Sequence, residues 1–374
     1  MHFEWIDRPD RWRELRDVWD DVVATSASPS IFATFDFLET SWNHFALSHR
    51  NELAVLALWD DGRLEGFAPL RLSRRRLYGL PRRKLSLLSD WESDRAPVAF
   101  PQGREEECTV AMLRFLGEHR GRWDLLKLGQ VTPDGGVARG ASAWCRDHED
   151  VALLEEEGSP SPFVPLEGLT WEEYLARLGS RTRKNVRRYL HQLETGGGYA
   201  LEVFDQPEAM AGALDLYLEI ERRSWKRDAG QGVGKDARNE AFYRELLPRL
   251  ARKGRSTVAF LRHQDRRVAA LIEHSLNGVV YAAQTTFDGQ TGHLSPGAAL
   301  QALCLKRRMA QGMREYELFA KFLQDKLRWT THLRQNRDVT IQQRGRLRHK
   351  LLFAGGVAFK RLRGLVGGPR TPRP

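Results

Sequence analysis

The stretch Ser295-Pro296-Gly297, at the start of an otherwise apolar segment, has the residue types that could bind phosphate. Ser295 suits an N-cap, because its hydroxyl can accept a backbone N–H of the first turn. Pro296 then falls at the first helical position, where its missing N–H costs nothing, and Gly312 suits the left-handed residue that closes a helix. Gly297 lets another group approach the backbone, and the first turn of a helix attracts anions. Most capped helices bind nothing, so these residues alone favour a plain capped helix over a phosphate site.

A second candidate for anion binding is the basic stretch GSRTRKNVRRYLHQLE, residues 179–194. A helix capped by Ser180 would place Arg181, Lys184 and Arg188 on one face. Val186, Leu190 and Leu193 would approximate another, apolar face. The cationic face could bind phosphate or another acid, but an isolated run of this kind is more often only solvated.

A glycine-rich loop follows Trp225-Lys226 and extends to Gly234. Loops of this kind often cover sites. The loop lacks the spacing of a phosphate-binding Walker motif, so on its own it is weak evidence for nucleotide binding.

Length and composition limit the class of protein and the number of domains to which these residues can belong. The chain has 374 residues, of which 41% are hydrophobic, so we expect two folded domains. The three cysteines are far apart, which argues against a disulfide framework and against a cysteine-based metal site. The N-terminus is acidic and aromatic where a signal peptide would be basic and then apolar, and no apolar run is long enough to span a membrane. A cytoplasmic protein without a bound metal is the simplest expectation.

The net charge of +10 is concentrated at the C-terminal end. Residues 344–374 contain nine Lys or Arg and no Asp or Glu, so the remaining body is close to neutral. The segment 346–374 mixes basic residues with Leu, Phe and Val. This basic tail could lie on an anionic membrane surface at the inner face of the membrane, or it could be a solvated end with no specific role.

The order hairpin, helix, strand occurs twice along the chain. A hairpin around Asp61-Gly62, in residues 53–72, precedes a helix at about 104–119 and then a strand. Three strands in residues 256–288, with turns near Gln264-Asp265 and Asn277-Gly278, precede a helix at about 296–311 and then a strand. The stretch 155–170 is rich in Pro, Gly and Ser, which is typical of a joint between two units. The pattern therefore predicts two related domains, residues 1–160 and 161–345, followed by the tail.

The two predicted helices differ at their first turns. The helix of the first unit begins with Glu105, Glu106 and Glu107, whose carboxylates would repel a phosphate. The helix of the second unit has no acid there. If only one unit binds an anionic cofactor, we expect it to be the second.

Taken in order, these segments resemble a known family. The sequences SRTRKNVRRYLHQLE, ERRSWK, RVAALIEHSLNGVVYAAQTTFD, LSPGAALQALCLKRRMAQG and DKLRW look like those of GNAT-superfamily acetyltransferases of the CelD/BcsL type. These bacterial enzymes are linked to cellulose and exopolysaccharide biosynthesis and are related to the FemAB peptidyltransferases. The resemblance is strongest over residues 166–345. It implies an α/β (α+β) fold of tandem GNAT-like domains, each a mixed, mostly antiparallel sheet flanked by helices.

The resemblance also implies transfer of an acyl group from acetyl-CoA or another acyl-CoA, with no metal. Ser295, Gly297 and Ala298 would then bind the cofactor pyrophosphate, although the family's glycine-rich loop Q/R-x-x-G-x-G/A is absent. Acyl transfer needs a neutral amine and donors for the developing oxyanion. We expect Glu273 as the base and Tyr281, with Tyr316 as the alternative, as the acid toward the leaving thiolate. Each of the three could instead have a purely structural role. The residues expected at the acceptor or cofactor pocket are Arg181, Lys184, Trp225 and Lys326.

Three functions remain open from the sequence. The first is an acyl-CoA-dependent N- or O-acyltransferase acting on a cell-envelope or exopolysaccharide saccharide, or on an amine-bearing precursor. The second is a FemAB-like peptidyltransferase that uses aminoacyl-tRNA, the one case in which we expect a nucleic-acid partner. The third is a non-enzymatic module that binds a polysaccharide or its synthase.

Overall fold

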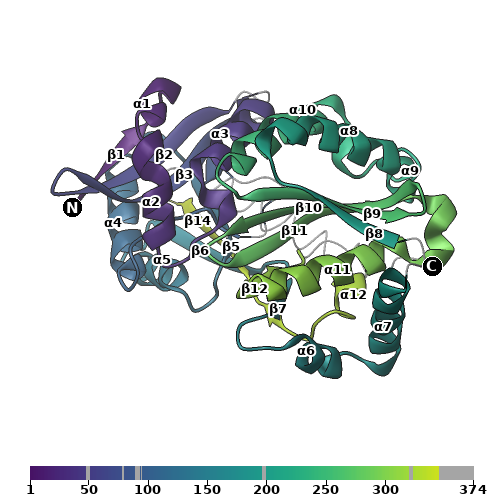
Figure 1. Ribbon diagram of the computed structural model, residues 1–374. Coiled ribbons are helices and arrows are strands. Elements are labelled where there is room, and N and C mark those ends of the chain that lie inside the picture. Colours follow the sequence, from purple (N-terminus) through teal and green to yellow (C-terminus); the bar gives the residue numbers. More distant parts are fainter. Residues whose placement is uncertain are drawn as a thin grey trace.

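The computed structural model describes residues 1–47, 51–77, 80–88, 93, 95–195, 199–319 and 323–344. The described chain forms two seven-stranded sheets, each flanked by helices (Figure 1). The predicted basic tail, residues 346–374, lies outside the described residues.

The first sheet has the strand order β1-β2-β3-β4-β5-β14-β6. Its strands pair antiparallel except for β4 and β5, which are parallel. The bounds are β1 His2–Ile6, β2 Glu52–Asp60, β3 Arg63–Leu77, β4 Leu80–Leu87, β5 Leu125–Val131, β6 Val151–Glu157 and β14 Arg337–Gln343.

The second sheet has the order β8-β9-β10-β11-β12-β7-β13. Again one pair is parallel, between β11 and β12, and the others are antiparallel. The bounds are β7 Ser161–Pro165, β8 Tyr199–Phe204, β9 Ser256–His263, β10 Arg266–Leu276, β11 Val279–Phe287, β12 Glu315–Glu317 and β13 Leu333–Arg334.

Most helices cover the faces of these two sheets (Figure 1). In the first half they are α1 Pro9–Arg13, α2 Arg16–Thr25, α3 Phe35–Ser41, α4 Glu105–Glu118 and α5 Gly136–Arg146. In the second half they are α6 Trp171–Arg177, α7 Ser180–Glu194, α8 Met210–Glu221, α9 Trp225–Asp228, α10 Ala237–Ala251, α11 Pro296–Ala310 and α12 Leu323–Lys326. The hairpins and the helices expected at 104–119 and 296–311 are confirmed. Ser180 is the first helical residue of α7, and Gly179 occupies the N-cap without a side-chain hydrogen bond, so the predicted Ser180 cap is wrong.

The two sheets have the same plan, and the strands form two sequence repeats, β1–β7 and β8–β14, each of which gives one strand to the sheet of the other. Between β5 and β6, the first sheet contains β14, which comes from residues 337–343. At the equivalent place, between β12 and β13, the second sheet contains β7, which directly follows β6 in the sequence. The predicted fold class, two mixed and mostly antiparallel sheets flanked by helices, is confirmed. The predicted boundaries at 160 and 345 stay a prediction. Residues 161–345 contain every strand of the second sheet and also β14, so the first sheet is incomplete without residues 337–343.

The hairpin turns follow directly from the local sequence. Asp61 and Gly62 have φ of 48° and 76°, and Asn277 and Gly278 have φ of 46° and 76°. Both central residues are therefore left-handed, as a two-residue type I′ hairpin turn requires and as Asp-Gly and Asn-Gly favour.

Three hydrophobic clusters hold these layers together. One lies between the first sheet and α4 and α5, and another lies between the second sheet and α7 and α11. The third joins the two halves, because it combines side chains of α2 and α3 with side chains of α8, α10 and the second sheet.

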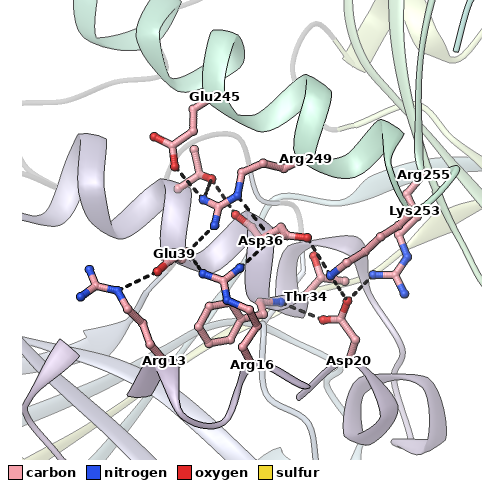
Figure 2. A network of polar contacts seen from close by, with 12 residues as sticks. Arg13, Arg16, Asp20, Thr34, Asp36, Glu39, Glu245, Arg249, Lys253 and Arg255 are labelled. Atoms are coloured by element: carbon pink, nitrogen blue, oxygen red, sulfur yellow. Dashed lines mark hydrogen bonds and ion pairs between the residues drawn. The ribbon is translucent and has the colours of Figure 1, made fainter. Parts of the chain in front are cut away.

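An ion-pair network also joins the halves, across α3 and α10 (Figure 2). The Glu39 carboxylate, 4% exposed, accepts hydrogen bonds from the guanidinium groups of Arg13 at 3.0 Å, Arg16 at 2.5 Å and Arg249. Lys253 contacts Asp36 at 2.7 Å. Burial raises the pKa of Glu39, but the three guanidinium groups outweigh it, and the pKa lies below its ordinary value.

Candidate functional site

A pocket of about 320 Å³ opens at the end of β11, beside the start of α11. It brings together five of the nine residues expected at the site. These are Ser295, Gly297, Ala298, Trp225 and Lys326. The remaining walls come from Ala282–Phe287 of β11, from Gln301, and from residues 318, 319, 325, 328 and 329.

One wall of the pocket is an unpaired strand edge. β11 pairs with β12 only through Val279, Val280 and Tyr281, and from Ala282 to Phe287 it has no strand partner on that side in the described chain. Ile272 of β10 pairs with Gln284 and Glu273 pairs with Ala282, so Ala283 forms a bulge. This edge offers backbone N–H and C=O groups to a ligand in the pocket.

The start of α11 forms the second wall, and its cap differs from the one expected. Ser295 occupies the N-cap position but has left-handed φ of 53°, and its hydroxyl makes no capping hydrogen bond. The N–H groups of Ala298 and Ala299 both donate to the Ser295 carbonyl at 3.1 Å. Pro296 has no N–H. Gly297 is therefore the first-turn residue whose N–H makes no hydrogen bond to a described residue. The helix start therefore offers a single backbone donor to an anion.

Packing against Phe287 gives a second reason for a glycine at position 297. A Cβ added at this position would lie 3.2 Å from Cδ1 of Phe287, which is tighter than ordinary contact. At the other end of the helix, Gly312 has φ of 72° and donates to the Met309 carbonyl at 2.9 Å, which confirms the predicted helix end.

Two buried polar groups that line the pocket were missed by sequence reasoning. Gln301 is 4% exposed and its Nε2 has no hydrogen-bond partner, and Thr286 is 1% exposed with an unpartnered Oγ1. Since buried polar groups are normally satisfied, both suggest a ligand or water in the pocket. Gln301 could have been found from its position, one helical turn after Gly297 on a helix that is otherwise apolar there.

The charged residues around the pocket are mostly cationic. Lys226, Lys326 and Arg328 line it together with one carboxylate, Asp325. Burial lowers the pKa of Lys326 to about 8, with a further decrease from Arg328 and a partial compensation from Asp325. Trp225 lies at the same pocket with 44% of its surface exposed. An anionic ligand would gain from these cations, and an apolar or sugar ring could stack on the indole.

Glu273 does not line this pocket. Its side chain is fully buried and accepts hydrogen bonds from Arg308 Nε at 2.9 Å and from the Tyr316 hydroxyl. Thr257 Oγ1 donates to it at 3.4 Å. A carboxylate held in this way stabilises the contact between β10 and α11, and its geometry lends no support to the base role expected from the sequence.

Tyr281 also lies apart from the pocket lining, in the core that joins the two halves. It is 1% exposed, with its ring centroid 5.2 Å from that of Phe32 and 5.8 Å from the Arg95 guanidinium carbon. Burial raises the pKa of its hydroxyl. Its role as an acid stays a prediction that this placement does not favour.

Arg181 and Lys184 lie on the exposed face of α7 and do not line the pocket. The opposite face of α7 packs Val186 and Leu190 into the second half's core, as the spacing predicted. Among the described residues no group of three or more His, Cys, Asp or Glu side chains could hold a metal ion.

Comparison with known proteins finds a family similar to part of the second half. Residues 180–325 match the family model for an acetyltransferase (GNAT) domain. The matched segment contains α11, the unpaired edge of β11 and most of the pocket. The family match begins at residue 180, so it does not cover the first half, and curated protein sequences give no significant match.

Solved structures show the same fold over both halves. FemX is 12% identical with a TM-score of 0.61, covering 91% of this chain and 97% of FemX. A conserved protein of unknown function from Bacteroides thetaiotaomicron is 13% identical with a TM-score of 0.57, covering 91% and 99%. The C-terminal domain of a putative lysylphosphatidylglycerol synthetase from Agrobacterium fabrum is 13% identical with a TM-score of 0.55, covering 92% and 96%. At these identities the likeness concerns the fold alone.

Proposed function

We propose that the second half is an acyltransferase that takes an acyl group from acetyl-CoA or another acyl-CoA and transfers it to an amine or hydroxyl. The observation that carries this proposal is the unpaired edge of β11 inside a pocket that also contains the start of α11. The amide groups of the coenzyme's pantetheine arm are well suited to pair with such an edge, as an added strand does. The free Gly297 N–H and the positive end of α11 would contact the pyrophosphate.

The residues present fit this donor. Lys226, Lys326 and Arg328 supply positive charge for the phosphates, and the bulge at Ala283 exposes backbone groups where the thioester carbonyl would lie. In the transfer step a neutral amine or hydroxyl attacks the thioester carbon, the carbon–sulfur bond breaks, and the thiolate takes up the proton that the acceptor releases. Trp225 at the pocket supports a saccharide acceptor, so we propose a cell-envelope or exopolysaccharide sugar or its precursor.

Calorimetric titration of acetyl-CoA into the wild type and into Gly297→Glu and Gly297→Ala tests the donor. The glutamate places a carboxylate where the phosphates are proposed, so we expect loss of binding. The alanine is the matched control, because it adds the Cβ that meets Phe287 without adding charge, and we expect it to weaken binding less. If the wild type binds no acyl-CoA of any chain length, the coenzyme A proposal is wrong.

Aminoacyl-tRNA is the alternative donor, as in a FemAB-like peptidyltransferase. The specific support is the exposed cationic face of α7, with Arg181, Lys184 and Arg188. This alternative predicts binding of charged tRNA whose affinity falls steeply with salt, and Lys184→Gln should reduce that slope. Acyl-CoA binding together with weak, unselective tRNA binding would exclude it.

A further inference from the structure

A second pocket, of about 350 Å³, lies on the first sheet and is lined almost entirely by basic side chains and hydroxyls. Arg71, Ser73 and Arg75 of β3 lie directly opposite Ser86, Lys84 and Arg82 of β4. These six residues share one face of the two strands, because side chains alternate along a strand and the register pairs them. We call them the β3–β4 basic pocket.

The opposite face of β3 and β4 is apolar, in contrast to the face with the six basic and hydroxyl residues. Leu70, Leu72, Leu85 and Leu87 point the other way and pack under α4 and α5. Further along the side of the basic pocket, Phe67 and Leu88 belong to the core that joins the two halves. The basic residues therefore continue this core-facing surface outward, with Arg71, Arg82 and Lys84 half-buried and Arg75 exposed.

Three of the positive charges in this pocket are not neutralised by the described residues. Arg75, Arg82 and Lys84 form no ion pair with a described residue, whereas the nearby Lys127 pairs with Asp338 at 2.6 Å and Arg83 with Asp124 at 2.8 Å. Arg75 and Arg82 lie directly opposite each other, an arrangement of like charges that destabilises a sheet. Burial lowers the pKa of Lys84, and the charges of Lys127, Arg71, Arg82 and Arg75 lower it further.

We propose that the β3–β4 basic pocket binds the pyrophosphate group of a small molecule, such as a nucleoside diphosphate or a diphosphate-linked sugar. Guanidinium groups bind phosphate oxygens through paired hydrogen bonds, and the Ser86 hydroxyl can add a donor. A pocket with several cations complements the charge of a pyrophosphate better than that of a single phosphate. The pocket has the size of a small-molecule site, and its half-buried Arg82 and Lys84 make it concave, unlike a flat surface for a membrane or a nucleic acid.

This site is separate from the acyl-CoA pocket, so its test uses a ligand without a thioester. Inorganic pyrophosphate, inorganic phosphate and UDP are titrated calorimetrically into the wild type and into Arg82→Gln, Lys84→Gln and Arg74→Gln. Arg74 is the matched control, because it lies on the same strand, points to the other face and pairs with Glu52. We expect pyrophosphate and UDP to bind more tightly than phosphate, and each pocket variant to lose about tenfold or more in affinity while the control keeps it.

Two further variants keep the outcome clear. Arg82→Lys retains the charge and should retain most of the affinity, which separates loss of charge from loss of fold. In a Gly297→Glu background, which blocks the anion site proposed at the start of α11, Lys84→Gln should still lose about tenfold in pyrophosphate affinity, because the β3–β4 basic pocket lies on the other sheet. Equal losses in Arg74→Gln and Lys84→Gln, or no pyrophosphate binding by the wild type, would overturn the proposal. So would binding that is confined to anionic phospholipid vesicles or to tRNA.

Discussion

At the scale of single residues, Lys326 should make ligand binding depend on pH. Its pKa is lowered to about 8, so its ammonium group is charged below that pH and neutral above it. If the ammonium group contacts a phosphate of the coenzyme, acetyl-CoA affinity should fall as the pH rises through about 8. Titrations between pH 6.5 and 9.5 would show a step in the dissociation constant.

The matched variants for this prediction are Lys326→Arg and Lys326→Met. The arginine stays charged throughout the range, so the step should disappear while tight binding remains. The methionine should bind weakly at every pH and should fold at least as stably, because it removes a desolvated cation. An unchanged step in both variants would assign the titration to another group.

Several of the residues expected at the site do line the pocket, although their roles stay predictions. Gly297 and Pro296 follow from the chemistry of a helix start, and Lys326 and Trp225 follow from the family resemblance. Glu273 could not be judged in the same way, because its burial depends on Arg308 and Tyr316, which lie 35 and 43 residues away. The local sequence around a strand glutamate is the same whether its carboxylate is exposed or buried and paired.

At the scale of elements, β14 lies in the first sheet and β7 in the second. This exchange between the repeats β1–β7 and β8–β14 predicts that a substitution in one repeat loosens the sheet of the other. Ile341, fully buried in β14, packs in the first sheet. Ile341→Ala should destabilise the protein by about 2–5 kcal/mol. Hydrogen exchange should accelerate first in β5 and β6, which flank β14, and less in β12.

The reciprocal variant is Val164→Ala. The Val164 side chain, in β7, is 2% exposed and packs in the core of the second sheet. It should accelerate exchange in β12 and β13 while it leaves β5 and β6 protected. Equal acceleration in both sheets for both variants would show that the exchanged strands unfold only with the whole molecule.

Elements that depend on local patterns were predictable, whereas the exchange was not. Asp-Gly and Asn-Gly turns specify their hairpins, and the apolar spacing of Val186 and Leu190 placed the inner face of α7. The segment that contains β7 reads SPSPFVP, and its Pro and Ser content is typical of a linker. It becomes a strand because β12, at Glu315–Glu317, and β13, at Leu333 and Arg334, supply its partners on both sides.

At the scale of the whole molecule, the network around Glu39 should contribute to the contact between the two halves. Glu39→Gln removes the carboxylate that three guanidinium groups share, and it leaves them only their other partners, Asp10, Asp36 and Glu245. We expect a loss of about 3 kcal/mol in the free energy of unfolding, at the low end for buried ion pairs because Arg13 and Arg16 remain partly exposed. Urea unfolding would measure it, with Glu14→Gln as the control.

Glu14 pairs with Arg11 at 2.7 Å but its side chain is 62% exposed, so its loss should cost less than about 1 kcal/mol. The network also sets a pH dependence. The pKa of Glu39 is lowered in the folded protein, so its contribution is present above the ordinary carboxyl pKa and is lost as the pH falls through the lowered value. Equal costs for the two variants would show that the network adds nothing beyond surface pairing.

The global organisation was predicted in outline. The repeated order of hairpin, helix and strand indicated two related units, but the interface between them was not visible. Its apolar core combines α2 and α3 with α8 and α10, and no sequence pattern shows which faces of distant helices will meet. Within the described residues no helix is long and apolar enough to cross a membrane.

The exchanged strands also affect how the protein is made. A ribosome completes β6 roughly 180 residues before it reaches β14, the strand that must lie between β5 and β6. At typical elongation rates the nascent first half waits about 10 to 35 seconds with two strand edges unpaired. Such edges readily pair with other chains. We therefore expect the growing polypeptide to need chaperone protection during this interval, and to aggregate when translation stalls before residue 337.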